Sequence, residues 1–157
     1  DPIAAAENAK KTEAIKNVLP EFQELKDMNM KSAMEDAELS FHLAYDKDGN
    51  FIGAAVETFT NKGFSGNISL MVGILADGTV NNISVLQHAE TPGLGSKMSE
   101  PSFKDQFNNK HADSFNFNVK KDGGDVDAIT AATISSRAFC DAVNRAISTF
   151  ENNKGGF

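Results

Sequence analysis

The stretch LSFHLAY at residues 39–45 alternates apolar and polar side chains, and DKDGN at residues 46–50 separates it from a second apolar run at residues 51–58. Alternation with a period of two is typical of a half-buried strand, and a short break rich in Asp, Gly and Asn predicts a hairpin. Residues 68–74 and 80–85 repeat this arrangement around the turn ADG at residues 76–78. These four runs predict a meandering antiparallel sheet.

The segments on either side of this meander predict helices and one further strand. Residues 4–19 are rich in helix formers and stop before Pro20, so residues 1–37 are expected to be an N-terminal helical segment ahead of a core at residues 38–150. Phe103 and Phe107 lie four residues apart on one side of a short covering helix. Residues 114–119 alternate again, which predicts a late strand that joins the sheet.

The last helix is the clearest element in the sequence. Apolar residues recur at helical spacing from Ile134 to Phe150, while Arg137, Asp141 and Arg145 line the other side. The expected fold class is therefore α+β: a twisted antiparallel sheet with packed helices, including an amphipathic C-terminal helix. A chain of 157 residues is expected to fold as a single domain, residues 1–157.

Composition excludes several classes of function. Acidic residues outnumber basic ones by 22 to 15, and a net charge of −7 opposes contacts with nucleic-acid phosphates. Cys140 is the single cysteine, which excludes an intrachain disulfide and multi-thiolate metal sites. The three histidines are too scattered along the sequence to suggest a metal cluster, so no metal is expected. No apolar run reaches the roughly 20 residues of a membrane helix.

The segment DAITAATISS at residues 127–136 stands immediately before the last helix. Its hydroxyl groups suit an N-cap, because the first backbone N–H groups of a helix have no partner within the helix. The same N–H groups, next to small residues, also suit a phosphate. The two interpretations are compatible, and the residues alone leave both open.

This segment resembles the attachment sequence of the covalent FMN-binding domain family, found in the G subunit of the Rnf complex and in the C subunit of the sodium-pumping NADH:quinone oxidoreductase. The resemblance implies that a separate flavin transferase esterifies Thr133 to the phosphate of FMN. The family core usually has Gly where this chain has Ala131, a departure that adds one methyl group and restricts φ.

A second motif, HAETPGLGSK at residues 88–97, resembles a segment that follows a strand in the G subunit of the Rnf complex. Gly93 and Gly95 permit positive φ and a close approach of backbone amides to a planar ring. We expect Leu94 to pack on the flavin and Lys97 to contribute positive charge. The expected FMN-binding set is Thr133 with Asp127, Thr130, Ala131, Ala132, Ile134 and Ser135, together with Glu90, Thr91, Gly93, Leu94, Gly95 and Lys97. No catalytic residue is expected.

The resemblance implies an electron-transfer subunit of a membrane-bound Rnf complex that couples electron flow between ferredoxin and NAD to ion transport. Its expected partners are the other membrane subunits and the flavin transferase. The expected place is the extracytoplasmic, periplasmic side of the cell membrane, behind an N-terminal membrane helix that this chain lacks. The alternatives are the C subunit of the quinone reductase, a noncovalent module for flavin or another phosphorylated ligand, and an interaction domain whose threonines only cap a helix.

Overall fold

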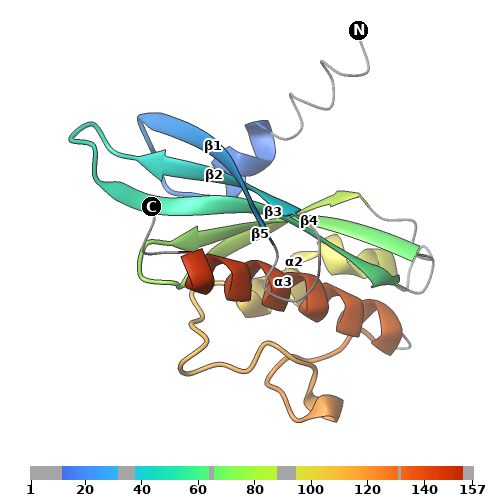
Figure 1. Cartoon of the computed structure of the whole chain (residues 1–157). Coiled ribbons are helices and arrows are strands. Elements are labelled where there is room, and N and C mark those ends of the chain that lie inside the picture. Colours follow the sequence, from blue (N-terminus) through green and yellow to red (C-terminus); the bar gives the residue numbers. More distant parts are fainter. Residues whose placement is uncertain (1–11, 32–37, 64–65, 88–94, 131, 154–157) are drawn as a thin grey trace, which may run out of the picture.

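The computed structural model describes residues 12–31, 38–63, 66–87, 95–130 and 132–153. Within these ranges, five strands form one sheet in the order of the sequence (Figure 1): β1 (Glu24–Lys31), β2 (Glu38–Tyr45), β3 (Phe51–Gly63), β4 (Gly66–Leu75) and β5 (Val80–Gln87). All neighbouring pairs are antiparallel. The two predicted hairpins, β2–β3 and β4–β5, are therefore confirmed, and the fold class is α+β.

The turn between β2 and β3 is closed by one side chain. Asp46 Oδ1 accepts hydrogen bonds of 2.9 Å from the backbone N–H groups of Asp48 and Asn50. Gly49 has a φ of 81°, which a glycine adopts at little cost. The N–H donors favour the carboxylate, and the bond from Asn50 is the largest influence that lowers the pKa of Asp46.

The expectation of a helical segment over residues 1–37 is corrected in its second half. Residues 12–18 are helical, but residues 24–31 form β1, which pairs with β2 along its whole length. β1 is an edge strand with mostly exposed side chains, and only Met28 and Met30 pack against the main core. Because so few of its side chains are buried, the strand shows almost no alternation of apolar and polar residues in the sequence, and it could not be predicted from that pattern.

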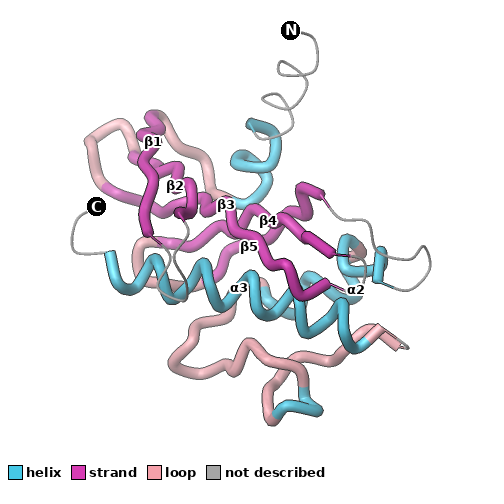
Figure 2. The backbone as a smooth tube through the Cα atoms, turned by 45° about the vertical axis from the view of Figure 1, so that its right-hand side comes forward, coloured by secondary structure: helices cyan, strands magenta, loops and turns pink. Residues whose placement is uncertain are grey.

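The expectation of a late strand at residues 114–119 is wrong. Within the described residues this stretch joins no strand of the sheet, and Val119 makes only an isolated bridge to Val126. Its alternation is nevertheless real, because Phe117 and Val119 are buried while Asn116 and Asn118 are exposed. The stretch runs past α3 (Thr133–Asn153) on the side away from the sheet (Figure 2).

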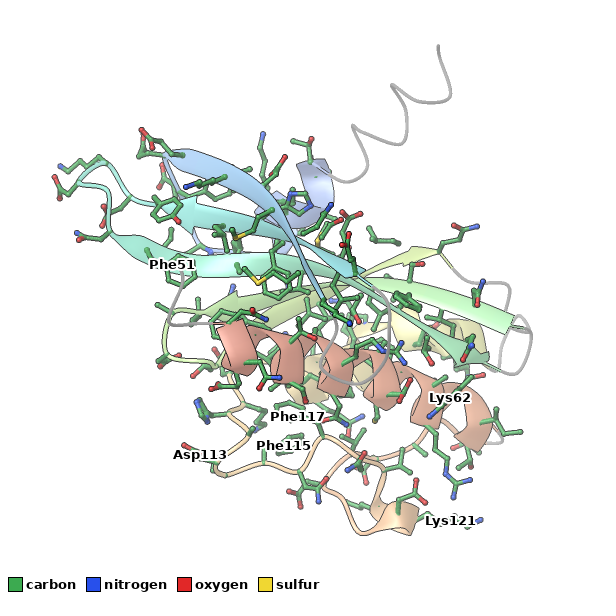
Figure 3. The ribbon with its side chains drawn as sticks, in the orientation of Figure 1. Phe51, Lys62, Asp113, Phe115, Phe117 and Lys121 are labelled. Atoms are coloured by element: carbon green, nitrogen blue, oxygen red, sulfur yellow. The ribbon has the colours of Figure 1, made fainter. Side chains whose placement is uncertain are left out.

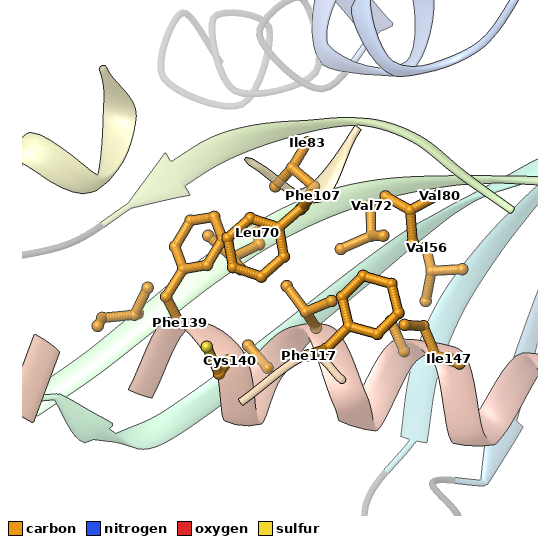
Figure 4. Packing of buried hydrophobic residues seen from close by; sticks show 14 of the residues in the cluster. Val56, Leu70, Val72, Val80, Ile83, Phe107, Phe117, Phe139, Cys140 and Ile147 are labelled. Carbon is orange, nitrogen blue, oxygen red and sulfur yellow. The ribbon is translucent and has the colours of Figure 1, made fainter. Parts of the chain in front are cut away.

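The main core lies between the sheet and α3. The short helices η1 (Gly95–Ser99), α2 (Pro101–Lys104) and η2 (Asp105–Phe107) each contribute a buried side chain to this core, and η3 (Lys120–Asp122) lies in the connection to α3. The rings of Phe107 and Phe139 lie 4.9 Å apart, and Phe117 stacks on Phe107 at 6.1 Å (Figure 4). Burial raises the pKa of the Cys140 thiol to about 12, so this residue behaves as a small apolar side chain.

The opposite face of the sheet carries a second, smaller core. Residues 12–18 pack there, with Ile15, Val18 and Leu19 against Ala55 and Met71. No helix among the described residues is long and apolar enough to cross a membrane. The sheet thus carries packed residues on both of its faces.

Candidate binding site at the start of α3

Two hollows lie near the start of α3. One of about 460 Å³ is lined by residues of the first turns of α3, including Ile134 and Arg137, and one of about 290 Å³ is lined by the segment 127–130 that precedes the helix. The smaller one contains Lys97 from η1 together with Asp127 and Thr130 from the segment before α3. Lys97 comes from one of the two sequence motifs, and Asp127 and Thr130 come from the other. The structure therefore brings parts of both motifs to one place. The other lining residues are Ser102, Phe103, Gln106, Ala128 and Ile129.

Hydrogen bonds from two directions hold the segment 127–130. Gln106 Oε1 accepts a hydrogen bond of 2.7 Å from the N–H of Asp127, and Gln106 Nε2 donates to the carbonyl of Asp127 at 3.0 Å. Two residues later, the N–H of Ile129 donates to Ser136 Oγ at 2.9 Å. Ser136 belongs to the first turn of α3, so this bond ties the segment to the helix that it precedes.

The first turn of α3 is continued backward by a tight turn. The N–H of Ala132 donates to the carbonyl of Ile129, and the N–H and hydroxyl of Ser136 both donate to the carbonyl of Ala132. Thr133 is the first residue of α3 and is partly buried. The first N–H groups of a helix have no partner within the helix, so the hydroxyl of Thr133 stands at the positive end of the helix dipole.

The smaller hollow is lined by two charged side chains, Asp127 and Lys97, which differ in their ion pairs. Lys120 Nζ lies 2.7 Å from Asp127 Oδ1, and this hydrogen bond is the main cause of the raised pKa of Lys120. Lys97 is exposed, and no carboxylate of the described residues lies within ion-pair distance of it. Asp127 is thus already paired at the rim, whereas Lys97 has no carboxylate partner among the described residues.

The remaining predicted residues are not all brought together. Ala132 and Ser135 are buried, so their side chains point into the protein rather than toward a ligand. Ile134 is 49% exposed and lines the larger hollow instead, beside Lys62, Arg137 and Asp141. Figure 3 shows Lys62 at this end of α3. Gly95 begins η1. The predicted residues Glu90, Thr91, Gly93, Leu94 and Ala131 lie outside the described residues.

Gln106 and Ser136 are site residues outside the predicted FMN-binding set. Ser136 is the last residue of the segment 127–136, whereas Gln106 belongs to no recognised motif and stands 21 residues before its partner Asp127. Phe103 was expected only as the apolar side of a covering helix. In the structure it also forms an apolar wall of the hollow.

Comparison with known proteins gives a consistent picture. The family model described as FMN-binding domain matches residues 63–148. The G subunit of the ion-translocating oxidoreductase complex of Shewanella baltica is 42% identical over 111 residues, covering 68% of this chain and 52% of that protein. The protein of the same name from Methanosarcina acetivorans is 35% identical over 147 residues, covering 91% and 76%. Against the Shewanella baltica relative, the chain therefore spans about half the length of the curated protein.

Two solved structures share the fold. NqrC of Shewanella oneidensis aligns with a TM-score of 0.57 at 22% identity, over 92% of this chain and 73% of that one. The C subunit of the Na(+)-translocating NADH-quinone reductase from Parabacteroides distasonis aligns with a TM-score of 0.65 at 20% identity, over 96% and 83%. At this level of identity the likeness concerns the fold alone.

Proposed function

The chain belongs to the FMN-binding domain family, and on that premise we propose that it is an electron-transfer subunit of an Rnf-type ion-translocating oxidoreductase complex whose FMN is joined to Thr133 through a phosphoester. The observation that carries this proposal is the meeting of Lys97 with the segment 127–130 directly before Thr133. One motif alone is compatible with a helix cap. Two motifs that converge on one hollow favour a ligand.

The residues present fit the phosphate end of FMN. The N–H groups at the start of α3 and the ammonium of Lys97 both favour a negative group, and Thr133 stands at the same helix terminus. Phe103 offers an apolar wall to a ring system. The charge of Asp127 is paired with Lys120, which limits its repulsion of a phosphate.

FMN, when bound, supplies reversible transfer of one or two electrons. The chain itself would supply binding and orientation: the α3 terminus and Lys97 would hold the phosphate, and Phe103 would present an apolar edge beside it. A phosphoester keeps the cofactor at its site at a high effective concentration even when noncovalent contacts break.

The proposed setting follows from the names of the relatives. Both curated relatives named above are described as G subunits of an ion-translocating oxidoreductase complex. These names support a role beside the other membrane subunits of such a complex. The periplasmic side of the cell membrane and maturation by a flavin transferase are further parts of the proposal, which the resemblance of the two sequence motifs supports. The same two relatives, at 35% identity or more, favour this assignment over the C subunit of the quinone reductase.

Intact mass spectrometry tests the covalent link. The chain is coexpressed with a flavin transferase and denatured before weighing, with Thr133→Val and Thr130→Ala treated in parallel. We expect the wild type and Thr130→Ala to gain one FMN minus one water, and Thr133→Val to gain nothing. Valine keeps the shape of threonine but has no hydroxyl to esterify. Flavin that copurifies with the wild type but is lost on denaturation would support the noncovalent module instead, and a gain that survives in Thr133→Val would place the link elsewhere.

A further inference from the structure

Gln106 makes a two-sided contact with the backbone of a single residue far along the chain. Its Oε1 accepts from the N–H of Asp127, and its Nε2 donates to the carbonyl of Asp127 and, at 3.1 Å, to that of Phe103. The orientation of this amide is dictated by chemistry, because only the oxygen can face an N–H and only the nitrogen can face two carbonyls. One side chain thus pairs with Asp127 as a neighbouring strand would.

The base of this contact is rigid. Gln106 lies between Phe103 and Phe107, which are 3% and 0% exposed. Their rings lie 5.0 Å and 4.9 Å from the ring of Phe139 on α3. Displacement of the Gln106 backbone away from Asp127 would require these rings to move, because interiors are close-packed. Gln106 therefore relates the segment 127–130 to the same helix on which Thr133 lies.

Apolar burial gives the segment little support, and its other contacts are polar: Lys120 Nζ lies 2.7 Å from Asp127 Oδ1, and the N–H of Ala132 donates to the carbonyl of Ile129. Asp127, Ala128 and Thr130 are exposed, and only Ile129 is buried. Of the four residues in the segment 127–130, only Ile129 is therefore held by the burial of an apolar side chain. The hydrogen bonds of Gln106 to Asp127 and of Ser136 to Ile129 hold the backbone on either side of Ala128.

We propose that Gln106 is a positioning residue for the attachment of FMN: it holds the segment 127–130 so that the hollow beside Lys97 and the start of α3 are formed before the flavin arrives. This inference rests on the proposed function. A segment held in advance lowers the conformational entropy lost when the transferase and its flavin donor engage it. The bond that forms is the phosphoester between the hydroxyl oxygen of Thr133 and the FMN phosphorus. The bond that breaks is the pyrophosphate of a flavin dinucleotide donor, whose nucleoside monophosphate leaves with the hydroxyl proton, and Gln106 takes no part in this chemistry.

The test measures the initial rate at which the transferase adds FMN to the purified chain, followed by intact mass, as a function of chain concentration. The variants are Gln106→Ala, which removes the amide, and Gln106→Glu, which keeps its shape but turns an oxygen toward two carbonyls. We expect kcat/KM to fall about tenfold in both, as the loss of two or three hydrogen bonds to the backbone implies. Hydrogen exchange at the amide of Asp127 should accelerate in parallel.

Two controls separate positioning from general stability. Gln23→Ala removes an exposed glutamine that lines neither hollow, and Phe115→Ala removes a partly buried ring outside the segment 127–130. Both should keep the wild-type rate of attachment, even if Phe115→Ala lowers the melting temperature as much as Gln106→Ala does. Wild-type rates in both Gln106 variants, or equal slowing by Phe115→Ala, would overturn this inference and leave the proposed function standing. A wild-type chain that acquires no FMN would overturn both.

Discussion

His42 is held by carboxylates from the strands on both sides of its own. Its Nδ1 lies 2.7 Å from Asp27 Oδ1 on β1, and its Nε2 lies 3.1 Å from Glu57 Oε2 on β3. Burial lowers the pKa of His42, but the hydrogen bonds and charges of Glu57 and Asp27 outweigh it, so the pKa is raised above 6.5. A raised pKa stabilises the fold below the unfolded value, and this contribution is lost as the pH rises through the folded pKa.

The free energy of unfolding should therefore fall as the pH rises from about 6.5 through the folded pKa of His42. Urea denaturation at steps of pH should show this slope in the wild type and a shallower one in His42→Asn. Asp27→Asn and Glu57→Gln should each reduce the slope, since each removes one of the two carboxylates. An NMR titration that places the folded pKa of His42 below 6.5 would contradict the prediction directly.

At the scale of elements, residues 12–18 dock on β4 and β5 through backbone atoms. A Cβ added at Gly73 would lie 1.9 Å from the carbonyl oxygen of Val18, so only glycine permits this approach. The Nδ2 groups of Asn81 and Asn82 donate to the carbonyls of Val18 and Asn17 at 2.8 Å and 3.0 Å. These two side chains satisfy carbonyls that a helix end leaves without partners.

Gly73→Ala should therefore push the N-terminal helix off the sheet at a cost of about 1–3 kcal/mol. Hydrogen exchange should accelerate for the amides of residues 12–19 and stay slow in β2 and β3. Asn81→Ala should give a smaller effect in the same region, because it removes one hydrogen bond and introduces no clash. Unchanged protection of residues 12–19 in Gly73→Ala would mean that the helix docks without this close approach.

The elements that could be predicted correctly are those in which apolar residues recur in the sequence at the spacing of a strand or a helix. β2 alternates, β4 has an apolar residue at every second position from Ile68 to Ile74, and turns rich in Asp and Gly separate these strands from β3 and β5. α3 has a buried side over 21 residues, so both hairpins and the last helix could be predicted. β1 could not, because its pairing partner rather than its side chains holds it in the sheet. At the site, Lys97, Asp127 and Thr130 belonged to recognisable motifs. Gln106 acts through tertiary hydrogen bonds that leave no local pattern.

For the whole molecule, the connection that leads into α3 is as much a part of the core as the sheet is. It runs past α3 on the side away from the sheet (Figures 1 and 2), yet Phe117 is only 3% exposed and packs on Phe107. Asn144 Nδ2 on α3 donates to the carbonyl of Phe117 at 3.0 Å. The sheet, α3 and this connection should therefore unfold together, although the connection contains little regular structure.

A matched pair of variants tests whether the sheet, α3 and the connection unfold together, because Phe115 and Phe117 lie two residues apart in the same connection. Phe115 is partly buried, with Lys110 Nζ 5.5 Å from its ring centroid, whereas Phe117 reaches the core. Phe117→Ala should cost about 3–5 kcal/mol through lost burial and a residual cavity, and Phe115→Ala about 1 kcal/mol.

Chemical denaturation followed by far-UV circular dichroism and by the reactivity of the Cys140 thiol should give one midpoint, lowered far more by Phe117→Ala. Since a pKa of about 12 keeps the buried thiol inert, its modification reports the opening of α3 from the sheet. Separate midpoints for the two probes, or equal costs for the two variants, would show that the connection opens independently of the core.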